Sequence, residues 1–149
     1  MVYRLDNTLG FAIHRAAVYL HRAFGQRLRP YELTPEQFAL LSRLWEEDGV
    51  PQRVLAERLL KDRPTVTRIL DRMVDKGLVT RRMDPADRRS YSICLTDKGR
   101  ELQAPLVRLA MEVRECAFAE LDEDERERVR QILNRISANL DGPTGGGQR

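Results

Sequence analysis

Two charged stretches in the middle of the chain carry side chains that could bind a nucleic acid. The first, KDRPTVTRILDR at residues 61–72, opens a segment of helical periodicity with arginine and threonine on its polar side. Arginine can donate two hydrogen bonds to guanine, and threonine can bond a base or place its methyl group on thymine. The second, DPADRRSY at residues 84–91, lies between two short apolar runs and predicts the projecting tip of a β-hairpin. Together the two stretches are typical of a DNA-binding surface.

The helix face and the hairpin tip would bind different parts of the duplex. Polar side chains near the start of a helix in the major groove reach base edges, whereas arginines in the minor groove meet its negative potential. Arginines further along the helix, and those on the incoming strand, would contact phosphates. The candidate DNA-binding residues are Arg63, Pro64, Thr65, Thr67, Arg68, Arg72, Arg81, Arg88 and Arg89. Asp87 would support the wing by holding an arginine in a bidentate pair.

The distribution of charge agrees with this interpretation. The chain has 149 residues and a net charge of +3. Residues 50–100 carry thirteen basic and seven acidic side chains, a net charge of +6, whereas residues 1–49 are neutral and residues 101–149 have a net charge of −3. A basic middle between neutral and acidic flanks is typical of a local surface that binds a polyanion.

Helices must position these two stretches. Apolar residues that recur every three or four positions mark a helix, and a Thr or Asp at its start caps it. The predicted helices span residues 6–28, 35–48, 51–60, 63–76, 97–121 and 123–140, and the expected N-caps include Thr34, Asp62, Thr96 and Asp122. Pro105 should kink the fifth helix or mark a frayed first turn. Short alternating runs at residues 78–83 and 91–95 predict the two strands of the hairpin.

Two helices joined by a short turn and followed by a charged hairpin form a winged helix-turn-helix. We therefore expect a mostly α fold with a small β-hairpin wing and with N- and C-terminal dimerisation helices. These flanking helices carry more apolar residues than one small core needs. The expected regions are a helical dimerisation region at 1–33 and 97–140, a winged helix-turn-helix DNA-binding region at 34–96, and a flexible tail at 141–149.

The sequence resembles the MarR family of bacterial and archaeal transcriptional regulators. The matching stretches are LTPEQFALL, LAERLLKDRPTVTRILDRMVDKGLVTRR, DPADRRSYSICLTDKGREL and ANL, and the close match covers about residues 34–102. The most specific residues are Asp87 and Arg89 in the wing and Leu95, Thr96 and Gly99 after it.

The resemblance implies a homodimer in which the first and the last two helices of each chain intertwine. It also implies a repressor that binds double-stranded DNA at a pseudo-palindromic operator. Members of the family often release DNA when a small phenolic or other aromatic acid binds, or when a cysteine is oxidised. For such an effector we expect a ligand-binding pocket lined by His14, Arg15, Tyr19 and Trp45.

Two other functions remain open. A winged-helix module could dimerise and bind protein partners without binding DNA, although such a module would not need four arginines on its outer surface. A redox-responsive regulator could use Cys94 or Cys116, which lie far apart and in no CxxC pattern.

Several classes of function are not expected. The sequence has no nucleophile–base pairing, phosphate-binding loop or metal motif, so we expect no enzyme, no catalytic residues, no cofactor and no metal. It also has no apolar run long enough to span a bilayer and no secretory signal, so we expect a cytoplasmic protein that does not associate with membranes.

Overall fold

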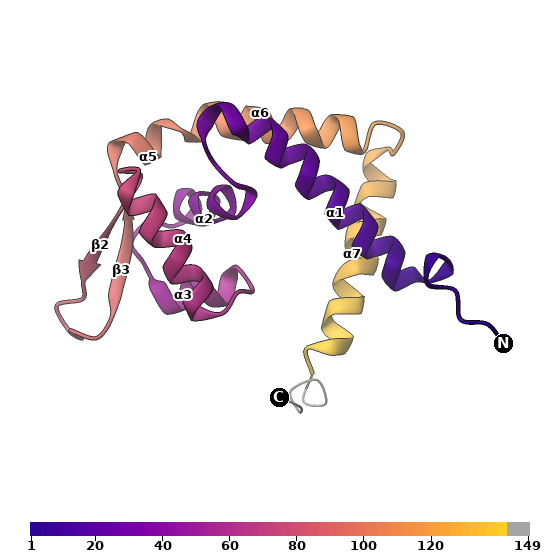
Figure 1. The fold of residues 1–149 in the computed structure, drawn as a ribbon, viewed down its shortest axis with the longest axis horizontal. Coiled ribbons are helices and arrows are strands. Elements are labelled where there is room, and N and C mark those ends of the chain that lie inside the picture. Colours follow the sequence, from indigo (N-terminus) through magenta and orange to yellow (C-terminus); the bar gives the residue numbers. More distant parts are fainter. Residues whose placement is uncertain (143–149) are drawn as a thin grey trace. The chain divides into compact units, whose positions relative to one another are not determined.

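The computed structural model describes residues 1–142, so the tail expected at 141–149 lies almost entirely outside the described residues. The chain divides into two units, one from Met1 to Val113 and one that begins at Arg114. The fold is mostly helical with a small antiparallel sheet, which confirms the predicted fold class (Figure 1). Among the described residues, none of the helices has the length and hydropathy that a membrane span requires.

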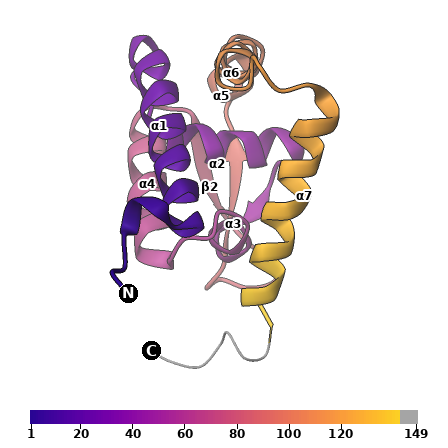
Figure 2. The ribbon, with the colours of Figure 1, turned by 90° about the vertical axis from the view of Figure 1, so that its right-hand side faces the viewer.

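The first unit holds the elements of the winged helix-turn-helix. Its helices are α1 (Leu9–Leu28), α2 (Pro35–Glu46), α3 (Gln52–Arg58), α4 (Arg63–Asp75) and α5 (Asp97–Glu101), its strands are β1 (Val50–Pro51), β2 (Val79–Met83) and β3 (Tyr91–Leu95), and short 3₁₀ turns occupy Leu5–Asn7 and Arg29–Tyr31. Helix α6 (Gln103–Ala117) crosses the boundary between the units, and α7 (Glu123–Leu140) lies in the second. Figure 2 shows α2 running crosswise to α1 within the first unit.

The sheet has three strands in the order β1–β3–β2, one strand more than the sequence predicts. Val50 pairs with Ile93 and Pro51 with Ser92, which places β1 beside β3. A strand of only two residues shows no alternation, so the pattern of the sequence could not reveal it. The predicted hairpin is confirmed, because β2 and β3 pair from Val79 opposite Leu95 to Met83 opposite Tyr91.

Four of the predicted helix starts are confirmed by hydrogen bonds at their N-caps. Thr34 and Gln37 form a reciprocal capping box at α2, and Asp122 and Glu125 form one at α7. Asp62 caps α4, and the hydroxyl of Thr96 accepts a bond from the Gly99 amide at α5.

Several predicted helices differ from the observed ones at their ends. Helix α2 ends at Glu46 and not at residue 48, and α3 spans Gln52–Arg58 and not residues 51–60. The segment expected as one helix at 97–121 is broken at Leu102 into α5 and α6. Pro105 then lies in the first turn of α6, where a missing amide hydrogen leaves no helical bond unmade. At the N-terminus, Thr8 caps α1, so the helix begins at Leu9 and not at residue 6.

One apolar core joins α2, α3, α4 and the sheet in the first unit. Helix α4 contributes a stripe of three residues that lie about one helical turn apart and have no exposed surface, namely Val66, Leu70 and Met73. The fully buried residues packed with this stripe include Leu40, Leu41, Leu44, Leu55, Ile93 and Leu106. Burying one side of α4 leaves its opposite, polar side at the surface.

The turn between α3 and α4 is closed by a leucine in the left-handed region. Leu60 has φ of 56°. Its amide donates to the Glu57 carbonyl at 3.1 Å, and the Lys61 amide donates to the Ala56 carbonyl at 3.1 Å. These are the bonds of a Schellman motif, in which glycine is the usual residue, as Gly77 is after α4. The sharp turn directs the chain into α4 after only four residues.

A close backbone contact fixes the start of α5. A Cβ atom at Gly99 would lie 2.3 Å from the carbonyl oxygen of Leu78, so only glycine fits there. The carbonyl of Gly99 also accepts a hydrogen bond from the Trp45 indole Nε1 at 3.0 Å. Glycine at this position therefore lets α5 pack directly against the backbone of Leu78 and bond to α2.

We predict that Gly99→Ala destabilises the protein by about 1–3 kcal/mol, because the backbone around Leu78 must move to admit the new methyl group. The matched control is Gly25→Ala in α1, where the nearest atom to the added Cβ is a Pro35 side-chain carbon at an ordinary 3.7 Å. Alanine there should raise stability slightly through its higher helix propensity. Chemical denaturation of both variants measures the difference, and equal stability of the two would show that the close contact at Gly99 is not restrictive.

Candidate nucleic-acid interface

Helix α4 is positioned by hydrogen bonds at both of its ends. At the start, a carboxylate oxygen of Asp62 accepts from the Thr65 amide at 2.7 Å. The bonds from Thr65 lower the pKa of Asp62 below its ordinary value, so the cap stays charged at neutral pH. At the end, the Lys76 ammonium group donates to the side-chain oxygen of Gln37 in the capping box of α2, at 3.2 Å.

Two grooves flank the exposed ridge of α4. The wing-side groove, of about 600 Å³, is lined by Arg63, Thr67 and Asp71 from successive turns of α4, together with Gln52, Arg81 and Arg89. The α2-side groove, of about 380 Å³, is lined by Thr65, Arg68 and Arg72 together with Lys61 and Glu36. The structure thus distributes the candidate residues of α4 between two sides of one helix.

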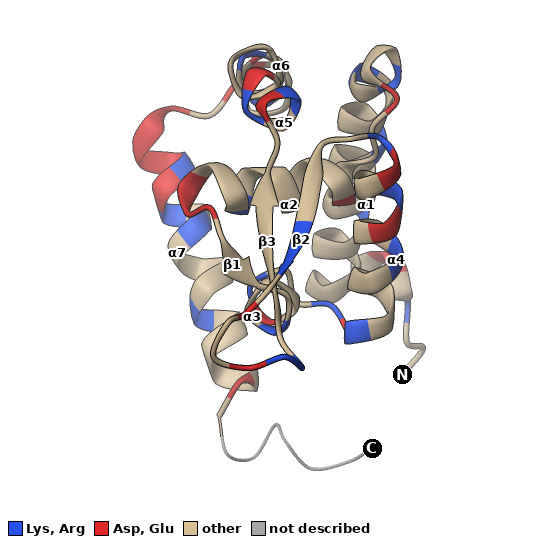
Figure 3. Cartoon of the chain, turned by 90° about the vertical axis from the view of Figure 1, so that its left-hand side faces the viewer, with Lys and Arg blue, Asp and Glu red and all other residues tan. Residues whose placement is uncertain are grey.

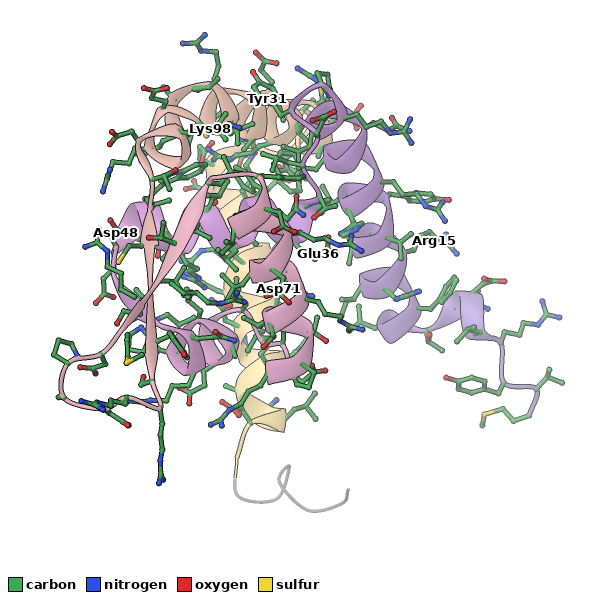
Figure 4. The ribbon with its side chains drawn as sticks, turned by 60° about the vertical axis from the view of Figure 1, so that its left-hand side comes forward. Arg15, Tyr31, Glu36, Asp48, Asp71 and Lys98 are labelled. Carbon is green, nitrogen blue, oxygen red and sulfur yellow. The ribbon has the colours of Figure 1, made fainter. Side chains whose placement is uncertain are left out.

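Arg81, which we expected to contact phosphate, is paired within the protein. Its guanidinium group lies 2.7 Å from a carboxylate oxygen of Asp71 and donates to the Thr67 carbonyl at 3.3 Å. Its side chain is only 25% exposed. Asp71 lies on α4 beside the strands, as Figure 4 shows. Arg81 therefore ties strand β2 of the wing to the middle of α4, a tertiary contact that the sequence does not reveal.

The acidic residues of the wing build its loop. Asp87 accepts a hydrogen bond from the Arg89 amide at 3.0 Å, and Asp84 accepts one from the Ala86 amide at 2.9 Å. The bidentate pair that we expected between Asp87 and an arginine side chain is not found among residues 1–142. A short carboxylate side chain bonds the backbone two residues ahead more readily than a distant guanidinium group. Asp87 thus supports the wing through the main chain.

The remaining arginines of this surface form no ion pair with a carboxylate of residues 1–142. Within the described part of the chain, no ion pair involves Arg63, Arg68, Arg72, Arg88 or Arg89, and Arg68 donates only to the Thr65 hydroxyl, at 3.3 Å. Elsewhere arginines do pair with carboxylates, as Arg58 does with Glu47 and Arg130 with Glu127. Figure 3 shows that the start of α4 and the tip of the wing lie at the same end of the first unit and that both carry basic residues.

Pro64 contributes shape to this surface and no hydrogen bond. It is exposed in the first turn of α4, where its lack of an amide hydrogen costs no helical bond. Any contact of Pro64 with DNA would be apolar.

The four residues expected to line an effector pocket do not form one group. His14, Arg15 and Tyr19 are exposed on α1, and Arg15 points away from the wing strands (Figure 4). Arg15 lies 3.5 Å from Asp6 and stacks on the Phe11 ring. Within residues 1–142, no hydrogen bond, ion pair or ring contact joins Trp45 to the other three.

Trp45 instead belongs to the edge of the core. Its ring packs edge-on against Phe38 at 5.9 Å, and its indole nitrogen is bonded to Gly99. The structure therefore gives this residue a packing role in place of the ligand contact that we expected. A large aromatic side chain at helical spacing satisfies either role, so the sequence could not separate them.

Sequence reasoning missed five residues that line the wing-side groove, namely Gln52, Arg53, Asp71, Ser90 and Tyr91. Asp71 follows Thr67 and Arg63 in a row of every fourth residue, which is a usable signal for a shared helix face. The side chain of Gln52 donates to the Thr67 hydroxyl at 2.8 Å. Gln52 and Arg53 follow the unpredicted strand β1, so their position could not be deduced.

The structure shows no metal or disulfide chemistry in the described residues. No group of three His, Cys, Asp or Glu side chains is arranged to hold a metal ion within residues 1–142. Cys94 is half-buried and Cys116 is exposed, and both are free thiols.

Comparison with known proteins matches this architecture to regulators of transcription. The MarR family model matches residues 33–91. The regulator TtmR of Methylorubrum extorquens (strain PA1) is 41% identical over 102 residues, which is 68% of this chain. The same match is 52% of TtmR, so this chain spans about half the length of that relative.

Solved structures share both fold and sequence with the chain. The transcriptional repressor CouR, in a structure bound to a 23-mer DNA duplex, is 32% identical with a TM-score of 0.83, and the match covers 92% of this chain and 99% of CouR. BpsR of Bordetella bronchiseptica, in a structure concerned with regulation of its DNA binding by 6-hydroxynicotinic acid, is 26% identical with a TM-score of 0.85, and the match covers 92% of this chain and 98% of BpsR.

The winged helix-turn-helix and the unpaired arginines on α4 and the wing point to the same class of protein as these similarities do. The chain belongs to the MarR family of DNA-binding transcriptional regulators.

Proposed function

We propose that the protein is a homodimeric repressor that binds a pseudo-palindromic operator and releases it when a small aromatic acid binds. Helix α4 enters the major groove, where Arg63, Thr65, Thr67 and Arg68 face base edges. Arg72 contacts phosphate, and the wing places Arg88 and Arg89 in the adjacent minor groove.

One observation carries this proposal. The arginines at the start of α4 and at the tip of the wing have no carboxylate partner among the described residues, and they lie at one end of the first unit (Figure 3). Unpaired guanidinium groups repel one another, and a polyanion that contacts all of them removes this cost. Phosphates and guanine edges of duplex DNA provide such contacts in both grooves.

Exposed apolar side chains support the homodimer. On α1, Leu9 is 68% exposed and Tyr19 60% exposed. Helix α7 buries none of its residues within a single chain, although Val129, Ile132, Leu133 and Leu140 recur on one side of it. A second copy that covers these helices would remove the apolar surface from water. The proposed dimerisation region is therefore residues 1–33 and 97–140, and residues 34–96 form the DNA-binding region.

The relation to BpsR supports the effector. That structure concerns 6-hydroxynicotinic acid, a hydroxylated aromatic acid. An acid of this class could pair with an exposed basic side chain on α1, such as Arg15, and stack on the neighbouring rings of His14 or Tyr19.

The direct test is binding of the purified protein to the promoter fragment upstream of its own gene across a series of salt concentrations. A protein that neutralises several phosphates shows a steep linear fall of log affinity with log salt, about 0.9 per phosphate contacted. A flat response would favour the alternative of a module that binds protein partners. Light scattering in dilute solution should give twice the mass of the 17.3 kDa chain, and the mass of one chain would contradict the dimer.

We predict that Arg68→Ala weakens operator binding and relaxes specificity at one base pair per half-site, by about 1–3 kcal/mol. The reason is that Arg68 lies in the α2-side groove with a guanidinium group free to bond guanine. Competition binding with operators changed at single positions measures the effect. Arg29→Ala removes the same charge from the 3₁₀ turn Arg29–Tyr31, outside α4 and the wing, and serves as the control. An equal loss on every sequence would assign Arg68 to phosphate contact.

We predict that Arg89→Ala lowers affinity more for an operator with A·T-rich flanks than for one with G·C-rich flanks. A narrow A·T minor groove has the stronger negative potential, so it gains more from an inserted arginine. Titration of both duplexes at low and at physiological salt measures the difference. Unchanged affinity for both duplexes would show that the tip of the wing does not contact DNA.

We predict that Asp71→Ala lowers operator affinity, although loss of a negative charge alone would raise it. Without Asp71, the guanidinium group of Arg81 is no longer held against α4, and the wing loses its fixed orientation. Asp75→Ala is the matched control, because Asp75 is exposed on the same helix and has no ion pair in the described residues. Asp75→Ala should raise affinity slightly. A rise for both variants would mean that Arg81, once released, binds phosphate as effectively as it supports the wing.

A further inference from the structure

The hydroxyl group of Thr67 is engaged within the protein on both its donor and its acceptor side. It donates to the Arg63 carbonyl one turn earlier, at 3.0 Å, and accepts from the side-chain amide of Gln52 at 2.8 Å. A hydroxyl has one hydrogen to donate, so this one cannot donate to a base without breaking the bond to Arg63. Both Gln52 and Thr67 line the wing-side groove.

Fixing the hydroxyl also fixes the methyl group, because both are carried on Cβ. In a helix, threonine divides between two side-chain rotamers, since its oxygen can bond either of two preceding carbonyls. The bond from Gln52 favours the rotamer in which the oxygen meets the Arg63 carbonyl and the Gln52 amide together. The methyl is then the side-chain group of Thr67 that has no polar partner within the protein.

We propose that Thr67 reads DNA through its methyl group, in contact with the C5-methyl of a thymine, and that Gln52 is the positioning residue that holds Thr67 in place. This inference rests on the proposed binding of α4 in the major groove. In general a threonine can either hydrogen-bond a base or contact a thymine methyl, and this inference assigns the methyl contact to Thr67.

The competing possibility is a hydrogen bond from a base amino group to the one remaining lone pair of the hydroxyl. The two contacts require different parts of the side chain. Thr67→Val keeps the methyl and removes the hydroxyl, whereas Thr67→Ser keeps the hydroxyl and removes the methyl. Replacing thymine by deoxyuridine in the operator removes only the C5-methyl from the DNA.

The experiment uses the full-length protein and its variants, and the operator is taken from the promoter fragment that the protein binds. Each thymine of the operator is replaced in turn by deoxyuridine, and the binding affinity of each duplex is measured. For the natural sequence, one replacement per half-site should lower affinity about fourfold, the effect of removing one methyl from an apolar contact. Thr67→Val carries a methyl at both Cγ positions and is held near one rotamer by the helix itself, so it should keep this fourfold difference without the bond from Gln52. Thr67→Ser should bind thymine and deoxyuridine duplexes equally well.

The proposal for Gln52 is tested in two backgrounds. Gln52→Met keeps the length of the side chain but cannot donate to Thr67, so it should reduce the difference between thymine and deoxyuridine in the natural background. In the Thr67→Val background, Gln52→Met should change neither the affinity nor that difference, because no hydroxyl is left to position. An equal loss of affinity in both backgrounds would show that Gln52 itself contacts DNA and would overturn its positioning role.

Other outcomes overturn the contact of Thr67. Indifference of the natural protein to every deoxyuridine, or loss of binding by Thr67→Val with retention by Thr67→Ser, would show that the methyl is not the reading group. Thermal melting of each variant checks that it is folded. Failure of the proposed DNA binding can be told apart from failure of the methyl contact. If the protein does not bind DNA, the unmodified promoter fragment already shows no salt-dependent binding.

Discussion

Helix α4 must bury one side in the core and leave its polar side exposed, and the rest of the structure depends on this constraint. Val66, Leu70 and Met73 are fully buried, so the helical period decides which residues face outward. Those residues separate into a row beside the wing and a row beside α2. A rotation of α4 about its axis would expose part of the core, so packing energy fixes which side chains face outward and, in the proposed function, meet the bases.

The charges on this surface divide into a structural set and a binding set. Arg81 is paired with Asp71 and joins the wing to α4, and the wing carboxylates are occupied by backbone amides. The arginines at the helix start and the wing tip are left without such partners in the described residues. The acidic groups thus hold the scaffold together, and the positive charge that we propose for DNA binding comes from side chains that these contacts do not use.

The helices could be predicted from sequence because their signals are local. The capping residues Thr34, Asp62 and Thr96 and the apolar spacing act within a few residues of each helix start. Strand β1 and the break at Leu102 depend on tertiary packing, as do the partners of Arg81 and Trp45. For the same reason the sequence indicated which residue types line the interface but not that Gln52 bonds Thr67, since these two residues come from different helices.

The bond between the Trp45 indole and the Gly99 carbonyl joins the body of the DNA-binding region to the helix that leads out of it. Trp45 is the single tryptophan of the chain. Its half-buried ring therefore gives the protein an intrinsic fluorophore at the contact between α2 and α5, and the local polarity sets its emission wavelength. Any rearrangement that separates α5 from α2 would admit water to the indole and shift the spectrum to the red, without an attached label.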